Sequence, residues 1–115
     1  IAMTARNWTA QFEWAAHHRQ GIAHGLAPEL LEAIRVRQRP DFAQADEEIV
    51  YDYVTELYAN RGISDSVHAR ALEALGVEGL VSIISVAGFY SYVAMVINAF
   101  DLEPRQEDPP PPLPE

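Results

Sequence analysis

Hydrophobic residues recur every three or four positions through most of the chain, a spacing that predicts amphipathic α-helices. No stretch alternates strictly between hydrophobic and polar residues for long enough to predict a β-strand. Gly25, Gly62 and Gly76 are each expected to end a helix, and Pro28 to stand at or near the start of one. We therefore predict an all-α fold of about five helices. The expected ranges are residues 3–24, 28–37, 45–60, 64–75 and 77–100.

The last of these helices differs from the others because residues 80–100 are apolar almost all round. Such a helix is either buried on several sides or crosses a membrane. Polar residues within the run, such as Ser85 and Asn98, and the lack of a basic residue at either end argue against a membrane span. We expect a long buried C-terminal helix at the centre of a homo-oligomer, which would be a dimer, a trimer or a hexamer.

The length of 115 residues corresponds to one domain at most. Residues 1–104 form the predicted helical domain, and the chain is expected to begin upstream of Ile1 because the first residues already suit a helix interior. Residues 105–115 form a proline-rich tail. Four prolines, Pro109–Pro112, predict extended polyproline structure that is either mobile or laid along a neighbouring subunit.

Composition excludes several classes of function. The net charge of −9 disfavours binding to nucleic acid and to anionic membranes. Because the sequence has no cysteine, disulfides, thiolate metal sites and thiol-based redox chemistry are excluded. No signal peptide is expected, and the cytoplasm is the expected compartment.

Acid–base chemistry is predicted for the second half of the first helix, where Glu13 and His17 lie one turn apart on one face. A carboxylate beside an imidazole would hold it in one tautomer and raise its basicity, which suits a general acid or base near neutral pH. Gly21 continues this face and leaves room for a ligand or a partner helix. The alternative is an ordinary helical pair that contributes about 0.2–0.5 kcal/mol in an interface.

Other polar and aromatic side chains are candidates for the same site as this pair. Trp14 flanks it and is expected to shape the wall of a substrate pocket, together with Gly21 and His24. His24 completes a possible metal-ligand set with the pair, but two turns of helix span about 10 Å, so neither a metal nor an organic cofactor is expected. Three arginines are candidates for holding a substrate carboxylate, although solvated faces explain them better: Arg6, Arg19 and Arg35.

The spacing Glu13-x-x-x-His17-x-x-x-Gly21-x-x-x-Gly25, followed by Pro-Glu-x-x-Glu-Ala-Ile at residues 28–34, resembles the carboxymuconolactone decarboxylase family. That family shares its all-helical fold with the alkylhydroperoxidase D proteins. Later segments are similar too: 46–48, 61–65, 75–81 and Gly88-Phe89-Tyr90. The resemblance covers the chain up to residue 104. It implies that Tyr90 is the third residue of the site.

The resemblance implies a cofactor-free, decarboxylase-like lyase that acts on a small organic acid or lactone, with His17, Glu13 and Tyr90 as its catalytic residues. The peroxidase branch of the family carries two cysteines, which would fall at Ala10 and Glu13 in this chain. A thiolate nucleophile is therefore missing, and alkylhydroperoxidase-like activity is disfavoured. A non-catalytic oligomeric binding or structural protein with the same fold is the remaining alternative.

Overall fold

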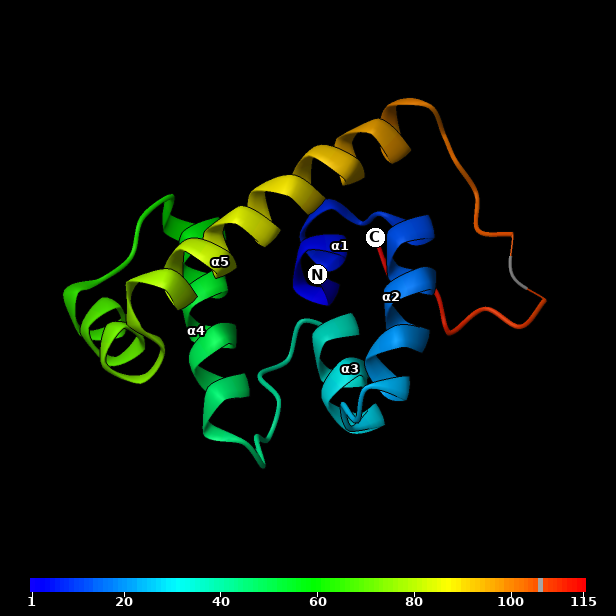
Figure 1. Ribbon diagram of the computed structural model, residues 1–115. Helices are drawn as coiled ribbons and strands as arrows, with labels where there is room; N and C mark the ends of the chain where they lie inside the picture. Colours follow the sequence, from blue (N-terminus) through cyan, green and yellow to red (C-terminus); the bar gives the residue numbers. More distant parts are fainter. Residues whose placement is uncertain (106) are drawn as a thin grey trace. The chain divides into compact units, whose positions relative to one another are not determined.

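The computed structural model describes residues 1–105 and 107–115, and within them it contains five α-helices and no β-strand (Figure 1). The all-α prediction is confirmed. The helices are α1 (Ala2–Trp8), α2 (Gln11–Ala23), α3 (Pro28–Arg35), α4 (Ala45–Asn60) and α5 (Asp65–Ala99). The chain divides into two compact units: unit 1 comprises residues 1–41 and 89–115, and unit 2 comprises residues 42–88. The candidate site residues all belong to unit 1.

The predicted first helix is in fact two helices, because the chain breaks at Thr9 and Ala10. Thr9 adopts a left-handed conformation with φ of 49° and ends α1, while Ala10 is extended and fully buried against Ala94 and Ile97 of α5. The side-chain amide of Asn98 donates a hydrogen bond to the carbonyl of Trp8 at 2.8 Å. These contacts with a distant part of the sequence override the local preference for a continuous helix.

The next two helices agree closely with the prediction. α3 begins at Pro28, and Gly25 before it has the expected positive φ of 93°. α4 covers the predicted range, but the left-handed residue that ends it is Arg61, with φ of 57°, and not Gly62.

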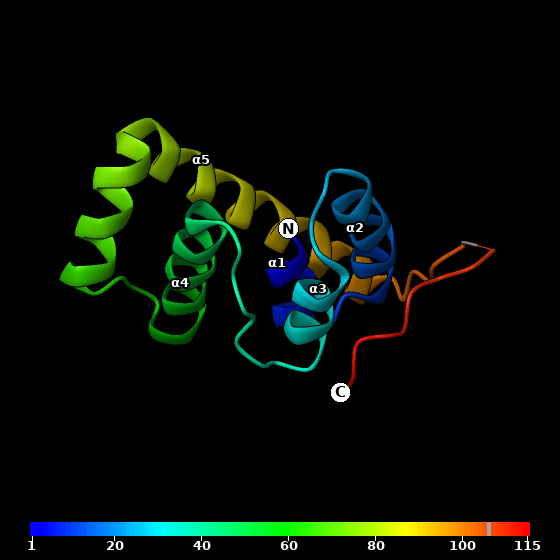
Figure 2. The ribbon, with the colours of Figure 1, turned by 90° about the horizontal axis from the view of Figure 1, so that it is seen from below.

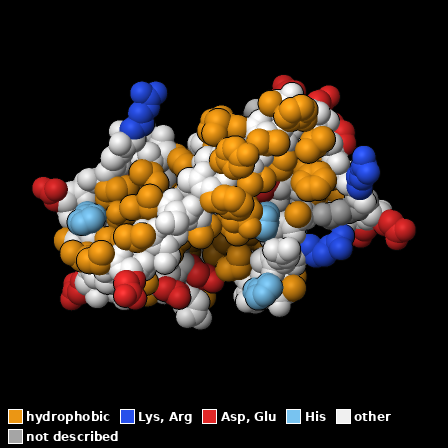
Figure 3. Space-filling view, turned by 45° about the horizontal axis from the view of Figure 1, so that its top comes forward, with side chains coloured by type: hydrophobic (Ala, Val, Ile, Leu, Met, Phe, Trp, Pro, Cys, Tyr) orange, Lys and Arg blue, Asp and Glu red, His pale blue; other side chains and the backbone are white. Residues whose placement is uncertain are grey.

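α5 contains both of the last predicted helices, which meet at Gly76. This glycine has φ of 66° and ψ of 176°, a non-helical conformation that kinks the chain where the sequence predicted a helix end. Beyond the kink the apolar surface is exposed, and only 22% of the most apolar stretch of α5 is buried. Within the single chain this stretch is therefore mostly uncovered, and its burial in an oligomer stays a prediction. Figure 3 shows hydrophobic side chains gathered over this helix.

Each unit has its own core. In unit 1, α1 packs against both α2 and α3, as Figures 1 and 2 show, and Trp14 and Leu31 are its largest buried apolar side chains. Trp8, the last residue of α1, is 36% exposed. In unit 2, Tyr53 of α4 packs with Ala71 and Leu80 of α5.

The end of the predicted tail, residues 111–113, lies along unit 1 of the same chain. Residue 106 of the predicted tail lies outside the described residues, and a contact with a neighbouring subunit stays a prediction. The segment 111–113 contacts α2 and α3 through hydrogen bonds to its three residues, Pro111, Pro112 and Leu113. Leu113 is 3% exposed and so belongs to the core of this unit.

Candidate functional site

Glu13 lies in the first turn of α2 and is buried, with 2% of its surface exposed. Neither of its carboxyl oxygens has a hydrogen-bond partner among the described residues. A buried carboxylate without a partner is costly, so the protonated form is favoured. Burial raises the pKa of Glu13 to about 7. This side chain therefore holds a proton through the mildly acidic range and titrates near neutrality.

His17 lies one turn further along α2 and packs against Tyr90 of α5. The two ring centroids are 4.9 Å apart at an interplanar angle of 85°, an edge-to-face arrangement typical of aromatic pairs. Burial lowers the pKa of His17, and a hydrogen bond with the side chain of Gln20 only partly opposes this effect. Tyr90 is itself edge-to-face with its neighbour Phe89 at 5.3 Å.

No hydrogen bond joins Glu13 to His17, since neither Glu13 oxygen has a hydrogen-bond partner among the described residues. The pKa of His17 is lowered, not raised. We expected a carboxylate that raises the basicity of the imidazole, and that expectation is wrong in direction. Desolvation by burial is the largest cause of both pKa shifts. The result is a neutral acid and a neutral base on one face of α2, with Tyr90 from α5 beside the base.

Trp14 is on a different face of α2 and is 1% exposed. Its indole N–H donates a hydrogen bond to the carbonyl of Pro111 at 3.0 Å, so its polar edge is taken up by the tail. On the same face its ring is edge-to-face with His18, at a centroid distance of 5.2 Å. Trp14 thus serves the docked tail in this structure.

The two remaining predicted binding residues lie near the end of α2. A Cβ atom at Gly21 would lie 3.1 Å from the side chain of Leu26. The space beside this glycine is therefore filled by the loop that follows α2, and not left open for a ligand. His24 is exposed, and its Nδ1 lies 2.8 Å from the carbonyl oxygen of Gln20. Within the described residues no three His, Asp or Glu side chains are gathered closely enough to hold a metal ion.

The three candidate arginines differ in their surroundings. Arg35 forms a two-pronged ion pair with Glu32, at 2.7 and 2.8 Å, and also donates to the carbonyl of Pro112 at 3.0 Å. Arg6 is not on a solvated face as expected: it is 5% exposed, its Nη1 lies 3.4 Å from Thr9 Oγ1, and burial lowers its pKa. The third, Arg19, is exposed.

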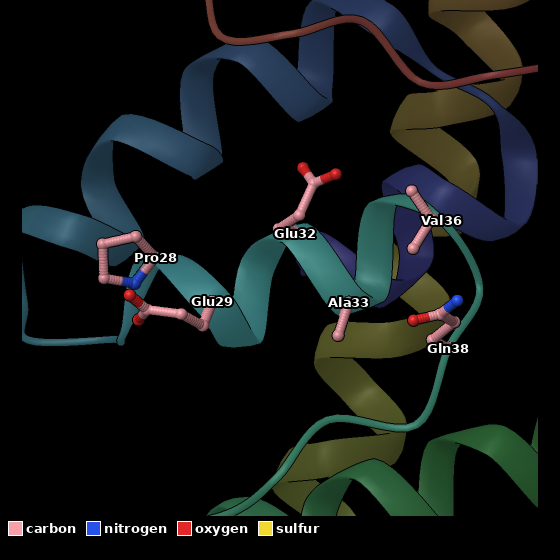
Figure 4. A pocket seen from close by; sticks show the side chains of 6 residues that line it. All are labelled: Pro28, Glu29, Glu32, Ala33, Val36 and Gln38. Carbon is pink, nitrogen blue, oxygen red and sulfur yellow. The ribbon is translucent and has the colours of Figure 1, made fainter.

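An open pocket lies along α3 and the turn that follows it (Figure 4). Its lining residues come from that segment alone: Pro28, Glu29, Glu32, Ala33, Val36 and Gln38. None of the predicted catalytic or substrate-binding residues is among them. The acidic lining does not suit an anionic substrate, so this pocket does not extend the candidate site.

Sequence reasoning missed the side chains that hold the tail. Gln11 forms two hydrogen bonds with the backbone of Leu113, and Arg35 forms one with Pro112. The signal that was available is the proline run itself, because prolines offer only carbonyl acceptors and therefore need donors such as glutamine, tryptophan or arginine side chains. Nothing in the sequence indicated which donors would supply them.

Comparisons with protein-family models, with curated proteins and with solved structures find no match for this chain.

Proposed function

We propose that the chain is a cysteine-free protein of the carboxymuconolactone decarboxylase type and a cofactor-free lyase for a small organic acid or lactone. The observation that supports this proposal is the inverted pair on α2: burial raises the pKa of Glu13 to about 7 and lowers that of His17. Groups whose environments push their pKa values past each other are suited to opposite roles in proton transfer. Glu13 would donate a proton, and His17 would accept one.

The proposed reaction needs one proton. Loss of carbon dioxide from a bound carboxylate leaves its electron pair on the substrate as an enolate, and the enolate takes the proton of the Glu13 carboxyl. Glu13 then regains a proton from water. A proton donor within hydrogen-bond reach of the developing charge accelerates such a step by roughly 10²- to 10⁴-fold. Neutral His17, supported by Tyr90, would bind an acidic hydrogen of the substrate.

The first experiment is a thermal-shift screen of the intact protein against small dicarboxylic acids and lactones, followed by a turnover assay on any acid that binds. A ligand at a hundred times its Kd stabilises the folded state by about 2.7 kcal/mol. We expect the shift and the turnover to be lost in Glu13→Gln and His17→Ala. They should persist in His68→Asn, which changes an exposed histidine of unit 2. Equal shifts in all four proteins would refute the site.

The same proposal predicts an acidic pH optimum. Turnover requires Glu13 protonated and His17 neutral, so the rate should fall as pH rises through about 7, where Glu13 loses its proton. It should also fall at acidic pH as His17 becomes charged, below the ordinary histidine range because its pKa is lowered. A rate that increases steadily from about pH 6 to 8 would contradict the assignment of Glu13 as the proton donor.

A non-catalytic oligomeric protein is the second candidate, and it is favoured by the exposed apolar surface of α5. Large side chains left uncovered on one helix mark an interaction surface more often than they mark a monomer. The most exposed are Val77, Val81, Phe89 and Tyr92, each more than half exposed. On this proposal His17→Ala changes assembly or stability but removes no turnover.

A third proposal, alkylhydroperoxidase-like activity, is carried only by the family resemblance. The sequence has no cysteine to act as peroxidatic thiol. An assay with a peroxide and a dithiol reductant should therefore show no consumption above background.

A further inference from the structure

The tail is held by side-chain donors that match the acceptors of a proline run. Prolines have no backbone N–H, so a segment such as Pro109–Pro112 can be recognised only through its carbonyl oxygens and its ring surfaces. Trp14 donates to the carbonyl of Pro111 at 3.0 Å, and Arg35 donates to that of Pro112 at 3.0 Å. Two successive proline carbonyls are thus bound by two different helices.

The contact continues at Leu113, the first residue after the proline run, which has a backbone N–H. Leu113 donates from its backbone to Gln11 Oε1 at 2.9 Å and accepts from Gln11 Nε2 at 2.8 Å, so one amide side chain satisfies both of its backbone groups. The Leu113 side chain is 3% exposed and anchors the segment. The site therefore binds a proline-proline-leucine sequence through the carbonyls of the two prolines and through the backbone and buried side chain of the leucine.

Two of the donors are also held by contacts with residues outside the tail. Glu32 binds Arg35 through two oxygens, at 2.7 and 2.8 Å, and leaves Nη1 free for Pro112. Trp14 is 1% exposed and is braced by His18 at a ring distance of 5.2 Å. Donors with fixed positions lose little conformational freedom when they bind, which favours recognition of a segment that is itself stiff.

We propose that the surface formed by Gln11, Trp14 and Arg35 is a recognition site for a polyproline II segment and that the chain's own tail, residues 109–114, occupies it as an intramolecular ligand. Aromatic side chains beside hydrogen-bond donors are the usual means by which proteins bind such segments. The proposal does not depend on the function proposed for Glu13 and His17, which lie on another face of α2.

An intramolecular ligand competes with any ligand added from solution. A short connection of the kind that links α5 to the tail gives the tail an effective concentration in the millimolar range. A separate proline-rich peptide should therefore bind the intact chain weakly, and bind it much better once the tail has been displaced without removing the donors.

The experiment uses the full chain with Leu113→Asp, which places a charge at the buried anchor. The probe is a labelled peptide, Pro-Pro-Pro-Pro-Leu-Pro-Glu, and the readouts are fluorescence anisotropy and the indole N–H signal of Trp14 in NMR spectra. We expect Leu113→Asp to shift that signal and the peptide to return it toward its wild-type position. Peptide affinity should be at least about tenfold higher than for wild type, because the tail no longer competes.

Three controls make the result specific. Leu102→Asp adds the same charge outside the docked segment and should behave like wild type. Gln11→Ala combined with Leu113→Asp should abolish the gain in affinity, and a peptide with aspartate in place of leucine should not bind. Equal peptide binding by wild type and Leu113→Asp, or full binding without Gln11, would overturn the proposal.

Two further outcomes would also overturn it. One is a Trp14 signal that Leu113→Asp leaves unchanged, because the tail then does not occupy the site. The other is a loss of molecular mass on Leu113→Asp in light scattering, because the tail would then come from a second copy of the chain.

Discussion

At the scale of single residues, Glu13 is the group whose state depends most on the fold. Its pKa is about 7 in the folded protein and near 4.5 when the chain is unfolded. Between these values the folded state binds more protons than the unfolded state, so stability decreases as pH rises through this window. It is constant above and below it. A buried carboxyl group with a strongly raised pKa is one mark of a functional site.

Glu13→Gln tests this pH dependence. The neutral amide cannot ionise, so the variant should match wild type near pH 4 and be more stable by about 3 kcal/mol near pH 8. Glu73→Gln, which replaces an exposed carboxylate of α5, is the matched control and should change little at either pH. Urea unfolding at the two pH values measures both. A gain for Glu13→Gln that is equal at both pH values would contradict the raised pKa.

The positions of Glu13 and His17 could be predicted from the sequence, but their pKa values could not. Helical spacing predicted that Glu13 and His17 lie one turn apart on one helix, and both lie in α2. Tyr90, which the family resemblance implied as a third residue, packs against His17. The spacing did not predict that Glu13 and His17 would be desolvated, because burial is decided by residues far away in the sequence. The direction of both pKa shifts therefore followed from packing and not from the spacing of the pair.

Among the helices, α5 contains glycines in two different backbone conformations, helical and non-helical. Gly76 has φ of 66°, in a region that side chains disfavour, and it stands where the sequence predicted a helix end. Gly88 lies in the uninterrupted part of the same helix, and nothing lies within 4 Å of where its side chain would be. The two positions are a matched pair for testing whether the kink is required.

Gly76→Ala should destabilise the protein by about 1–3 kcal/mol, because alanine is strained in that conformation. Gly88→Ala should be neutral or stabilising by up to about 1 kcal/mol, because alanine is the better helix former. Thermal unfolding of both variants gives the comparison. If Gly76→Ala were as stable as Gly88→Ala, the kink would not be a property of the native fold.

The helix boundaries show why element prediction succeeded in part. Starts marked by proline or by acidic first turns, as in α3 and α4, were predicted from local sequence alone. The break between α1 and α2 was missed because it depends on Asn98, which is 90 positions away from its partner Trp8. Local propensity cannot report such a contact.

For the molecule as a whole, the apolar surface of α5 is the feature left to explain, because most of it is exposed to water in the single chain. By length and composition α5 could cross a membrane, but one such helix is weak evidence for a membrane span. We propose that a second copy of the chain covers it, as the sequence suggested. Such a surface contributes roughly 25 cal/mol for each Å² that is removed from water.

Phe89→Glu combined with Tyr92→Glu should therefore reduce the molecular mass measured by light scattering, because two charges would be placed in the interface. These side chains are 58% and 61% exposed in the single chain, so their replacement should not disturb the core. Val50→Glu introduces a charge at an exposed apolar position of α4 and is the control. Unchanged mass in the double variant would show that this surface does not join copies of the chain.

The central claim is that unit 1 keeps a carboxylic acid protonated near neutral pH for use as a proton donor. The most direct test is a carbon-13 NMR titration of the Glu13 carboxyl group in the intact protein, with Glu13→Gln used to assign the signal. We predict a midpoint at about 7. A midpoint near 4.5, the ordinary value for glutamate, would show that Glu13 is an ionised residue at neutral pH and would contradict the proposed proton donor.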